Sequence, residues 1–397
     1  MLVVNKGGIS MTQFTHIDQL MKQYVEKNVA GCGCIVTHKG KIIYENYTGY
    51  ADIDTKTLLD EHSIHRMYSL TKVVVCTVGM MLFERGYFLL NEPVSKYLPE
   101  FSDMSVASYN FKGEPYIEKA KNPMLIKHLF EMSSGVPSSF GEGVVPKALT
   151  NEIAQLVQEN ATYSLRELVK ALAQAPLLFE PGTGWAYGFS HDILAALLEV
   201  VSGKSLKALL YDELFEPLQM HDTNYQFESE EQRKRMTSIY QDMGQEKLVS
   251  VKARGDENYE PDSVYCGGGT GLFSTLRDYS KFAQMLACGG LYEGKQLIGR
   301  KTIDLTRTNR LNKKQLSVFQ NQYTAGYGYG LGVRTLIDLA ESHGNGSVGE
   351  FGWTGMSGAY ALMDPSEQLS IVYAHQRLPN LEYEHHLRIR NAVYGCI

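Results

Sequence analysis

The chain has 397 residues, a formal net charge of −6, 44% hydrophobic residues and 21% charged residues. These values are typical of a globular protein with one large domain or two closely packed ones. The negative charge argues against nucleic acid or an anionic membrane as a partner, and no apolar run is long enough for a membrane-spanning helix.

The N-terminus has no basic segment followed by an apolar core, so no secretory signal is expected and a cytoplasmic location is predicted. The stretch Lys6–Met11 (KGGISM) resembles a ribosome-binding sequence read in frame and followed by a start codon. We therefore expect translation to begin at Met11. The cysteines contain no C-x-x-C pair, which predicts free thiols in a reducing compartment. They are Cys32, Cys34, Cys76, Cys266, Cys288 and Cys396.

In chain order, the first elements are a hairpin and a buried helix. Residues 31–37 and 41–48 flank the turn His38–Gly40 and predict two antiparallel strands. Residues 69–86 are apolar on nearly every side, which predicts a helix buried all round that ends near Gly86.

Further helices and strands follow from the apolar periods and the Gly and Pro breaks. The predicted helices are 124–133, 164–175, 190–202, 204–215, 276–288 and 381–394. The predicted strands are 328–336, 357–364 and 368–375.

Strands therefore lie at both ends of the chain, with helices between them, which predicts an α+β fold. An antiparallel sheet flanked by helices would form from residues 1–70 and 265–397. Residues 71–264 would form an inserted, mainly helical region. We expect one structural unit with the active site in the cleft between the two parts.

The tetrapeptide Ser69-Leu70-Thr71-Lys72 opens the predicted buried helix. Positions three apart share a helix face, so Lys72 would lie beside Ser69. A lysine in a dry site can lose its proton and serve as a base for a neighbouring hydroxyl. The N–H groups at a helix start can also stabilise an oxyanion. The alternative is an N-cap serine with a lysine that reaches solvent.

Two glycine-rich segments can supply the other groups that a serine nucleophile needs. Pro181–Ser190 brings Tyr187 to a turn, where a nearby ammonium would stabilise its ionised form and let it carry the serine proton. Gly349–Gly358 leads into a strand, whose edge can approach an acyl group closely and donate a backbone N–H to the oxyanion. The alternatives are a packed turn aromatic and an ordinary hairpin turn.

Other patterns do not predict sites. Gly344–Gly349 spells G-x-G-x-x-G, but it does not open a helix after a strand, as a dinucleotide site requires. The histidine pairs have no acidic or cysteine partners at ligand spacing, so neither a metal nor a cofactor is expected. These pairs are His62 with His65 and His385 with His386.

In order and spacing, the three motifs resemble those of the serine β-lactamase-like superfamily. Within it, the chain is most similar to class C β-lactamases, family VIII carboxylesterases and D-stereospecific peptidases. The likeness extends over nearly the whole chain and includes the segments LIKHLFEMSSGVP, FEPLQMHDTNY and GGGTGLFSTLRDYSKFAQML. The resemblance implies the β-lactamase/penicillin-binding-protein-like fold.

The resemblance also implies catalytic roles. Ser69 matches the nucleophile that becomes acylated, and Lys72 matches the lysine that lowers its proton affinity. Tyr187 matches the tyrosine of the Y-x-N motif, which acts as general base and then as general acid. The backbone N–H groups of Ser69 and Met356 would form the oxyanion hole.

Two departures from the family motifs concern the substrate. Trp353-Thr354-Gly355 occupies the K-T-G position, so Trp353 replaces a lysine that helps to bind carboxylates. Phe189 replaces the asparagine of Y-x-N. Both changes remove polar recognition and add apolar surface. We expect Phe189, Trp353, Thr354 and Gly355 to line the substrate site.

These residues predict a serine hydrolase that forms an acyl-enzyme at Ser69. A carboxylesterase for small to medium acyl esters is favoured, with weak β-lactam hydrolysis as a side activity. The alternatives are a D-aminopeptidase or DD-peptidase type of amidase, a β-lactamase, an acyltransferase, and a non-catalytic acyl-binding sensor. If Arg334 or Arg377 binds a substrate carboxylate, Trp353 is only a packing residue. The expected partner is a small-molecule ester, amide or lactam.

Overall fold

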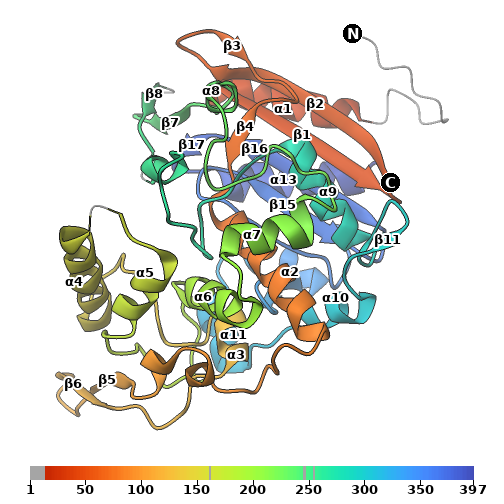
Figure 1. The fold of residues 1–397 in the computed structure, drawn as a ribbon. Coiled ribbons are helices and arrows are strands. Elements are labelled where there is room, and N and C mark those ends of the chain that lie inside the picture. The colour runs from red at the N-terminus through yellow and green to blue at the C-terminus, as the bar shows by residue number, and fades with distance from the viewer. Residues whose placement is uncertain (1–13, 161, 245–246, 254) are drawn as a thin grey trace.

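The computed structural model describes residues 14–160, 162–244, 247–253 and 255–397. The start site expected at Met11 lies outside the described residues. Figure 1 shows two neighbouring regions, one built around a large sheet and one mainly helical.

An eight-stranded antiparallel sheet joins the two ends of the chain, in the order β12-β13-β14-β15-β16-β1-β2-β3. The N-terminal strand β1 pairs with the C-terminal strand β16, with Val36 opposite Ile371. The fold class predicted from the sequence is confirmed, whereas the domain boundaries stay a prediction. The strands are β1 (Gly31–His38), β2 (Lys41–Asp52), β3 (Thr57–Leu58), β12 (Tyr327–Tyr329), β13 (Arg334–Leu336), β14 (Phe351–Thr354), β15 (Tyr360–Asp364) and β16 (Leu369–His375).

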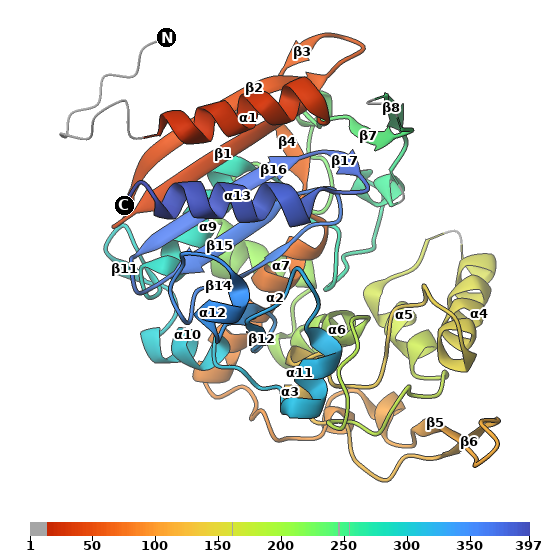
Figure 2. The ribbon, with the colours of Figure 1, turned by 180° about the vertical axis from the view of Figure 1, so that it is seen from behind.

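Helices cover both faces of this sheet. Figure 2 shows α1 (Thr15–Lys27) and α13 (Glu382–Tyr394) across one face. The buried residues Ile17, Met21 and Tyr24 form the apolar stripe of α1. Helix α9 (Leu276–Ala287) packs on the other face, where Thr275 caps its first turn through a hydrogen bond from Asp278 N. Because both faces are covered, β1 and β16 are apolar on both sides.

The predicted all-round buried helix is α2 (Thr71–Glu84), in which every residue from Thr71 to Leu82 is buried. It begins two residues later than expected, because Ser69 lies in a preceding 3-10 turn, Tyr68–Leu70. Gly86 follows the helix in the left-handed region, with φ +79°, as a C-terminal glycine should. Helix α2 packs against α6 (Ser190–Ser202), whose bounds agree with the predicted helix.

Several predicted elements differ from the structure. The strand predicted over 328–336 is a hairpin, because the chain turns between β12 and β13 and the turn residue Gly332 (φ +89°) packs against Cys76 of α2. The apolar pattern continues through this buried turn and hides it. The helix predicted over 124–133 is shorter, α3 (Ile126–Phe130), and the one over 204–215 divides into α7 (Leu206–Leu210) and a π-helical turn.

The mainly helical region also holds short strands and turns. Its other helices are α4 (Val144–Glu159) and α5 (Leu165–Leu172), and its strands are β5 (Ser105–Tyr109) and β6 (Pro115–Lys119). Figures 1 and 2 show α8 (Glu230–Lys234), β7 (Ile239–Asp242) and β8 (Leu248–Val251) beside the sheet-based region, where Tyr240 of β7 pairs with Arg377. The remaining elements are β4 (Ile64–Arg66), β9 (Phe273–Thr275), β10 (Leu291–Tyr292), β11 (Lys295–Gln296), β17 (Arg377–Leu378), α10 (Arg300–Thr306), α11 (Lys313–Phe319) and α12 (Leu339–Ser342).

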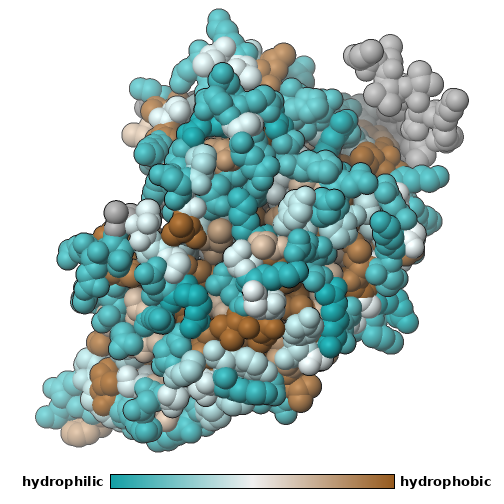
Figure 3. Space-filling view, viewed as in Figure 1, coloured by the Kyte–Doolittle hydropathy of each residue, from teal (hydrophilic) through white to brown (hydrophobic). Residues whose placement is uncertain are grey.

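The surface is mostly hydrophilic on the side drawn in Figure 3, with separate apolar patches and no continuous apolar band. Among the residues that the structure describes, no helix is both long and apolar enough to cross a membrane.

Candidate active site

The backbone around Ser69 is held in an unusual conformation. Tyr68 has φ +45°, in the left-handed region that non-glycine residues rarely adopt. The turn is fixed by two backbone hydrogen bonds, from Met67 N to Leu272 O at 2.9 Å and from Leu70 N to Met67 O at 3.0 Å. These bonds hold the half-buried Ser69 at the entrance to α2.

An ion pair braces the strand that leads into this turn. Arg66 at the end of β4 donates two hydrogen bonds to Asp256, both 2.8 Å long, and a third to Thr237 O at 2.6 Å. This bidentate geometry is the strong form of an arginine–carboxylate pair. It ties the segment before Ser69 to residues far along the chain.

Lys72 lies next to Ser69, as the spacing predicts. Its Nζ is 3.3 Å from Ser69 Oγ, 2.5 Å from Gly269 O and 4.7 Å from the centre of the Tyr187 ring. The side chain is 5% exposed, so its charge is stabilised by these groups and not by bulk water.

Asp192 and Gly269 complete the surroundings of the lysine. The buried Asp192 accepts a hydrogen bond from Gly269 N at 3.1 Å. Burial raises the pKa of Asp192, and the charge of Lys72 opposes that rise. A Cβ atom on Gly269 would lie 2.7 Å from Asp192 Oδ2 and 3.2 Å from Lys72 Nζ, so no side chain fits. Neither residue was predicted from the sequence, in which the run Gly267-Gly268-Gly269 is the signal of a close backbone approach.

Tyr187 closes the group from the opposite side. Its hydroxyl donates to Ser69 Oγ at 2.6 Å. Its ring stacks on Trp353, with ring centres 5.7 Å apart and planes at 15°. The Trp353 indole Nε1 donates to the Tyr187 hydroxyl at 3.4 Å. Trp353 therefore contacts the proton-carrying oxygen as well as forming an apolar wall.

The strand edge expected near Ser69 is present. A Cβ atom on Gly355 would lie 2.6 Å from Met67 O, so the end of β14 closely approaches the Ser69 turn. Gly355 N donates to Ala359 O at 2.7 Å, whereas Met356 N donates to no group in the described part of the chain. The half-buried Thr354 donates through Oγ1 to Glu382 Oε2 at 2.9 Å.

Phe189 directly precedes α6 and lies two residues after Tyr187. It is half-buried, packs against the main core, and its N–H donates to Val136 O at 3.3 Å. Within the described residues, no hydrogen bond or ring contact joins Phe189 to the Ser69 group.

The two arginines considered as carboxylate binders have other partners. The Arg334 guanidinium lies over the rings of Tyr323, Tyr327 and Tyr360, at 4.7, 5.3 and 5.6 Å, and the side chain is 5% exposed. Arg377 forms an ion pair with Asp242 and donates to Pro379 O at 3.2 Å.

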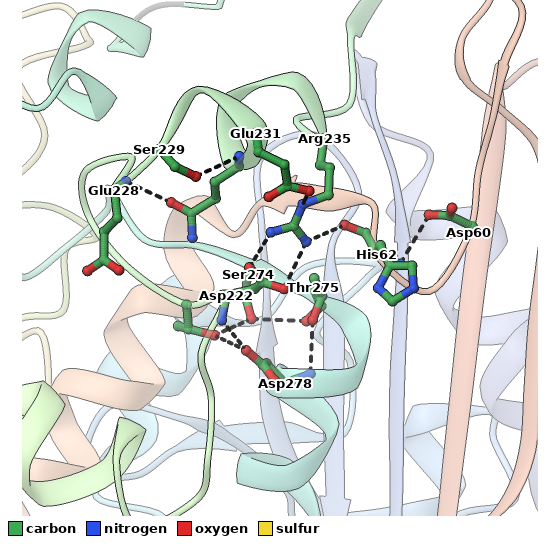
Figure 4. Close-up of polar contacts among 12 residues, drawn as sticks. Asp60, His62, Asp222, Glu228, Ser229, Glu231, Arg235, Ser274, Thr275 and Asp278 are labelled. Carbon is green, nitrogen blue, oxygen red and sulfur yellow. Dashed lines mark hydrogen bonds and ion pairs between the residues drawn. The ribbon is translucent and has the colours of Figure 1, made fainter.

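A separate polar pocket, with a volume of about 730 Å³, lies near β3 and α8. Figure 4 shows that its central cation, Arg235, is already paired with carboxylates. Arg235 Nη1 is 2.8 Å from Asp222, and its Nε is 3.0 Å from Glu231. None of Ser69, Lys72 and Tyr187 lines this pocket. Because its charged groups are paired with one another, they form a structural network, and we assign no catalytic role to this pocket.

Comparisons with known proteins agree with the fold. The family model described as "Beta-lactamase" matches residues 17–395. Protein Rv1367c of Mycobacterium tuberculosis is 27% identical over 362 residues, which cover 90% of this chain and 88% of that protein. Esterase EstB of Burkholderia gladioli is 25% identical over 392 residues, 93% of this chain and 92% of EstB. The solved structure of simvastatin synthase (LovD) from Aspergillus terreus matches with a TM-score of 0.83 and 19% identity, covering 97% of this chain and 99% of LovD.

Proposed function

This chain belongs to the β-lactamase family, and on that premise we propose that it is a serine hydrolase that cleaves neutral carboxylic esters through an acyl-enzyme at Ser69. The observation that carries the proposal is the contact of Ser69 Oγ with both Tyr187 and Lys72. A nucleophile, a proton carrier and a fixed positive charge meet at one oxygen. One relative named an esterase, EstB, matches over nearly the full length of both chains.

The acylation step begins when Tyr187 has lost its proton. The phenolate accepts the Ser69 proton while Oγ forms a bond to the substrate carbonyl carbon. The negative charge that develops on the carbonyl oxygen is stabilised by the N–H groups of Ser69 and Met356. The C–O bond to the leaving group then breaks, and Tyr187 passes the proton to the departing alkoxide.

Deacylation repeats these steps with water. Tyr187 takes a proton from the water, whose oxygen attacks the acyl carbon, and returns a proton to Ser69 Oγ as the ester bond breaks. The Lys72 ammonium stabilises the phenolate throughout, because it lies over the Tyr187 ring.

Preference for an ester over a β-lactam or a peptide terminus rests on the missing carboxylate anchor. Trp353 brings no charge, and Arg334 and Arg377 are engaged by tyrosine rings and by Asp242. The Thr354 hydroxyl donates to Glu382. A substrate carboxylate would therefore be desolvated without a matched cation, which is costly.

The test compares p-nitrophenyl butyrate, a D-alanyl p-nitroanilide and a chromogenic cephalosporin on the full chain. We expect the butyrate to have the highest kcat/KM and Ser69→Ala to abolish its turnover. Ser317→Ala, at an exposed serine of α11, is the matched control. A fluorophosphonate should label the wild type once, at Ser69, by peptide mass spectrometry. A cephalosporin turned over better than the ester would move β-lactamase to first place, and a persistent acyl adduct without turnover would favour the sensor.

A further inference from the structure

A carboxylate bonded to the strand edge beside the Ser69 turn is not used by the mechanism above. Glu382 is the first residue of α13 and accepts the Thr354 hydroxyl at 2.9 Å. Thr354 belongs to the strand edge that approaches the Ser69 turn through Gly355. The nearby Asn380 holds this edge as well, because its Nδ2 donates to Gly355 O at 3.3 Å.

The negative charge of Glu382 has no cation to balance it. No ion pair to Glu382 is formed among the described residues, and the cations around this end of the site have other partners. Lys72 is held by Gly269, Arg377 by Asp242, and Arg334 by tyrosine rings. Burial raises the pKa of Tyr323 to about 12, and the Glu382 charge adds to that rise while Arg334 opposes it.

A structural role alone would explain an acid at this position, since the first turn of a helix favours negative charge. Glu384 occupies the same first turn of α13, but it is exposed. Only Glu382 is half-buried and bonded to the strand beside the nucleophile. Substitution of each glutamate in turn therefore distinguishes an effect on the stability of helix α13 from an effect on the substrate site.

We propose that Glu382 sets the charge selectivity of the acyl site, disfavouring esters that carry a carboxylate and favouring neutral and cationic ones. This inference rests on the proposed function. A substrate carboxylate near Thr354 would meet a fixed like charge in a half-buried setting, where such repulsion is screened less than in water. A substrate ammonium at the same place would gain an attraction instead.

The first test measures kcat/KM for three 4-nitrophenyl esters of similar size. They are the butyrate (neutral), the hemisuccinate (anionic) and the 4-trimethylammoniobutanoate (cationic). Glu382→Gln keeps an acceptor for Thr354 and removes the charge. We expect it to raise the anionic-to-neutral ratio about three- to thirtyfold and to lower the cationic-to-neutral ratio by a similar factor. Glu384→Gln should change either ratio less than about twofold, as expected for an exposed charge.

A second readout does not need turnover. Phenylboronic acid, its 3-carboxy derivative and its 3-aminomethyl derivative add reversibly to a serine oxygen, and the tryptophan fluorescence of Trp353 and Trp185, both of which lie beside Tyr187, can report their binding. In the wild type the aminomethyl compound should bind most tightly and the carboxy compound least tightly. Glu382→Gln should reduce the differences in Kd among the three compounds.

The two readouts separate this inference from the proposed function. If boronates bind with this charge order but no ester turns over, the hydrolase proposal fails and the charge selectivity stands. If esters turn over but neither charge series responds to Glu382→Gln, or Glu384→Gln gives an equal response, Glu382 has no part in selectivity. The wild-type boronate series keeps the inference testable if the variant does not fold.

Discussion

At Ser69, one oxygen accepts hydrogen bonds from two unlike groups, a phenol and an ammonium. With both groups protonated, the serine proton has no acceptor among them. One of the two groups must therefore give up its proton before Oγ can attack, and the proposed mechanism assigns that step to Tyr187. Because Trp353 Nε1 points to the same phenol oxygen, the indole assists the charged form of the tyrosine as well as packing against it.

Tyr187→Phe should lower kcat for p-nitrophenyl butyrate about 10²–10⁴-fold, since it removes the proton carrier and keeps the ring. Tyr329→Phe is the matched control. Tyr329 contacts Trp353 edge to face, and its buried hydroxyl has no hydrogen-bond partner in the described part of the chain. The control should keep kcat within about twofold, because only an unused hydroxyl is lost. A loss below tenfold in Tyr187→Phe would leave Lys72 as the sole base.

The sequence could predict Ser69, Lys72 and Tyr187 because each lies in a short motif whose chemistry is local. It could not predict Glu382 or Gly269. The first acts through a contact with Thr354, 28 residues away, and the second through Lys72, 197 residues away. These two contacts depend on how distant helices, strands and loops pack together, and a short sequence motif carries no information about that packing.

Among the elements, helix α2 was predictable from its apolar run. Its position in the fold is fixed by the elements that pack against it, which the run does not reveal. Gly79 packs against the ring of Phe130 from α3, and a Cβ atom there would lie 2.9 Å from that ring. The β12–β13 hairpin was mispredicted as one strand because its turn is buried against α2 and so carries no polar signal. Burial by another element thus hides the local turn chemistry of this hairpin.

Gly79→Ala should therefore destabilise the protein, although alanine is the better helix former. Overpacking costs about 1–3 kcal/mol and helix propensity returns about 1 kcal/mol. Thermal melting should show a lower Tm. Gly395→Ala is the control, since a Cβ atom there would have no contact shorter than 3.4 Å. A Tm raised in Gly79→Ala would show that α3 can move away from α2 at little cost.

For the whole molecule, the sheet formed by both ends could be predicted from the apolar alternation, and the buried histidines could not. Burial lowers the pKa of His65 and His128 to about 4, and of His191 and His385 to about 3. The sequence pattern gave no sign of this, because each histidine is buried by segments distant in the chain.

Acid should therefore destabilise the fold already between pH 6.5 and pH 5, above the usual range of carboxyl pKa values. Below pH 6.5 the unfolded chain protonates these histidines and the folded chain does not, so the free energy of unfolding falls as pH falls toward 4. Glu131, whose burial raises its pKa to about 7, opposes the trend by binding a proton in the folded state. Four histidines outweigh one carboxyl, and these shifts together give an expected loss of about 5 kcal/mol between pH 7 and pH 5. Urea midpoints at pH 7, 6 and 5 measure it, and a constant midpoint would contradict the assignment of neutral histidines.

The pairing of β1 with β16 has a consequence for biosynthesis. The hydroxyls of Thr37 and Ser370 are 2.6 Å apart in space and 333 residues apart in the chain. At ribosomal rates of about 5–20 residues per second, β1 and β2 wait for roughly 15–70 seconds before the strand that covers their inner edge is made. During that interval the hairpin has an open edge of unpaired backbone groups, which other chains can pair with. Nascent chains of this protein should therefore depend on chaperone binding at their N-terminal hairpin until translation ends.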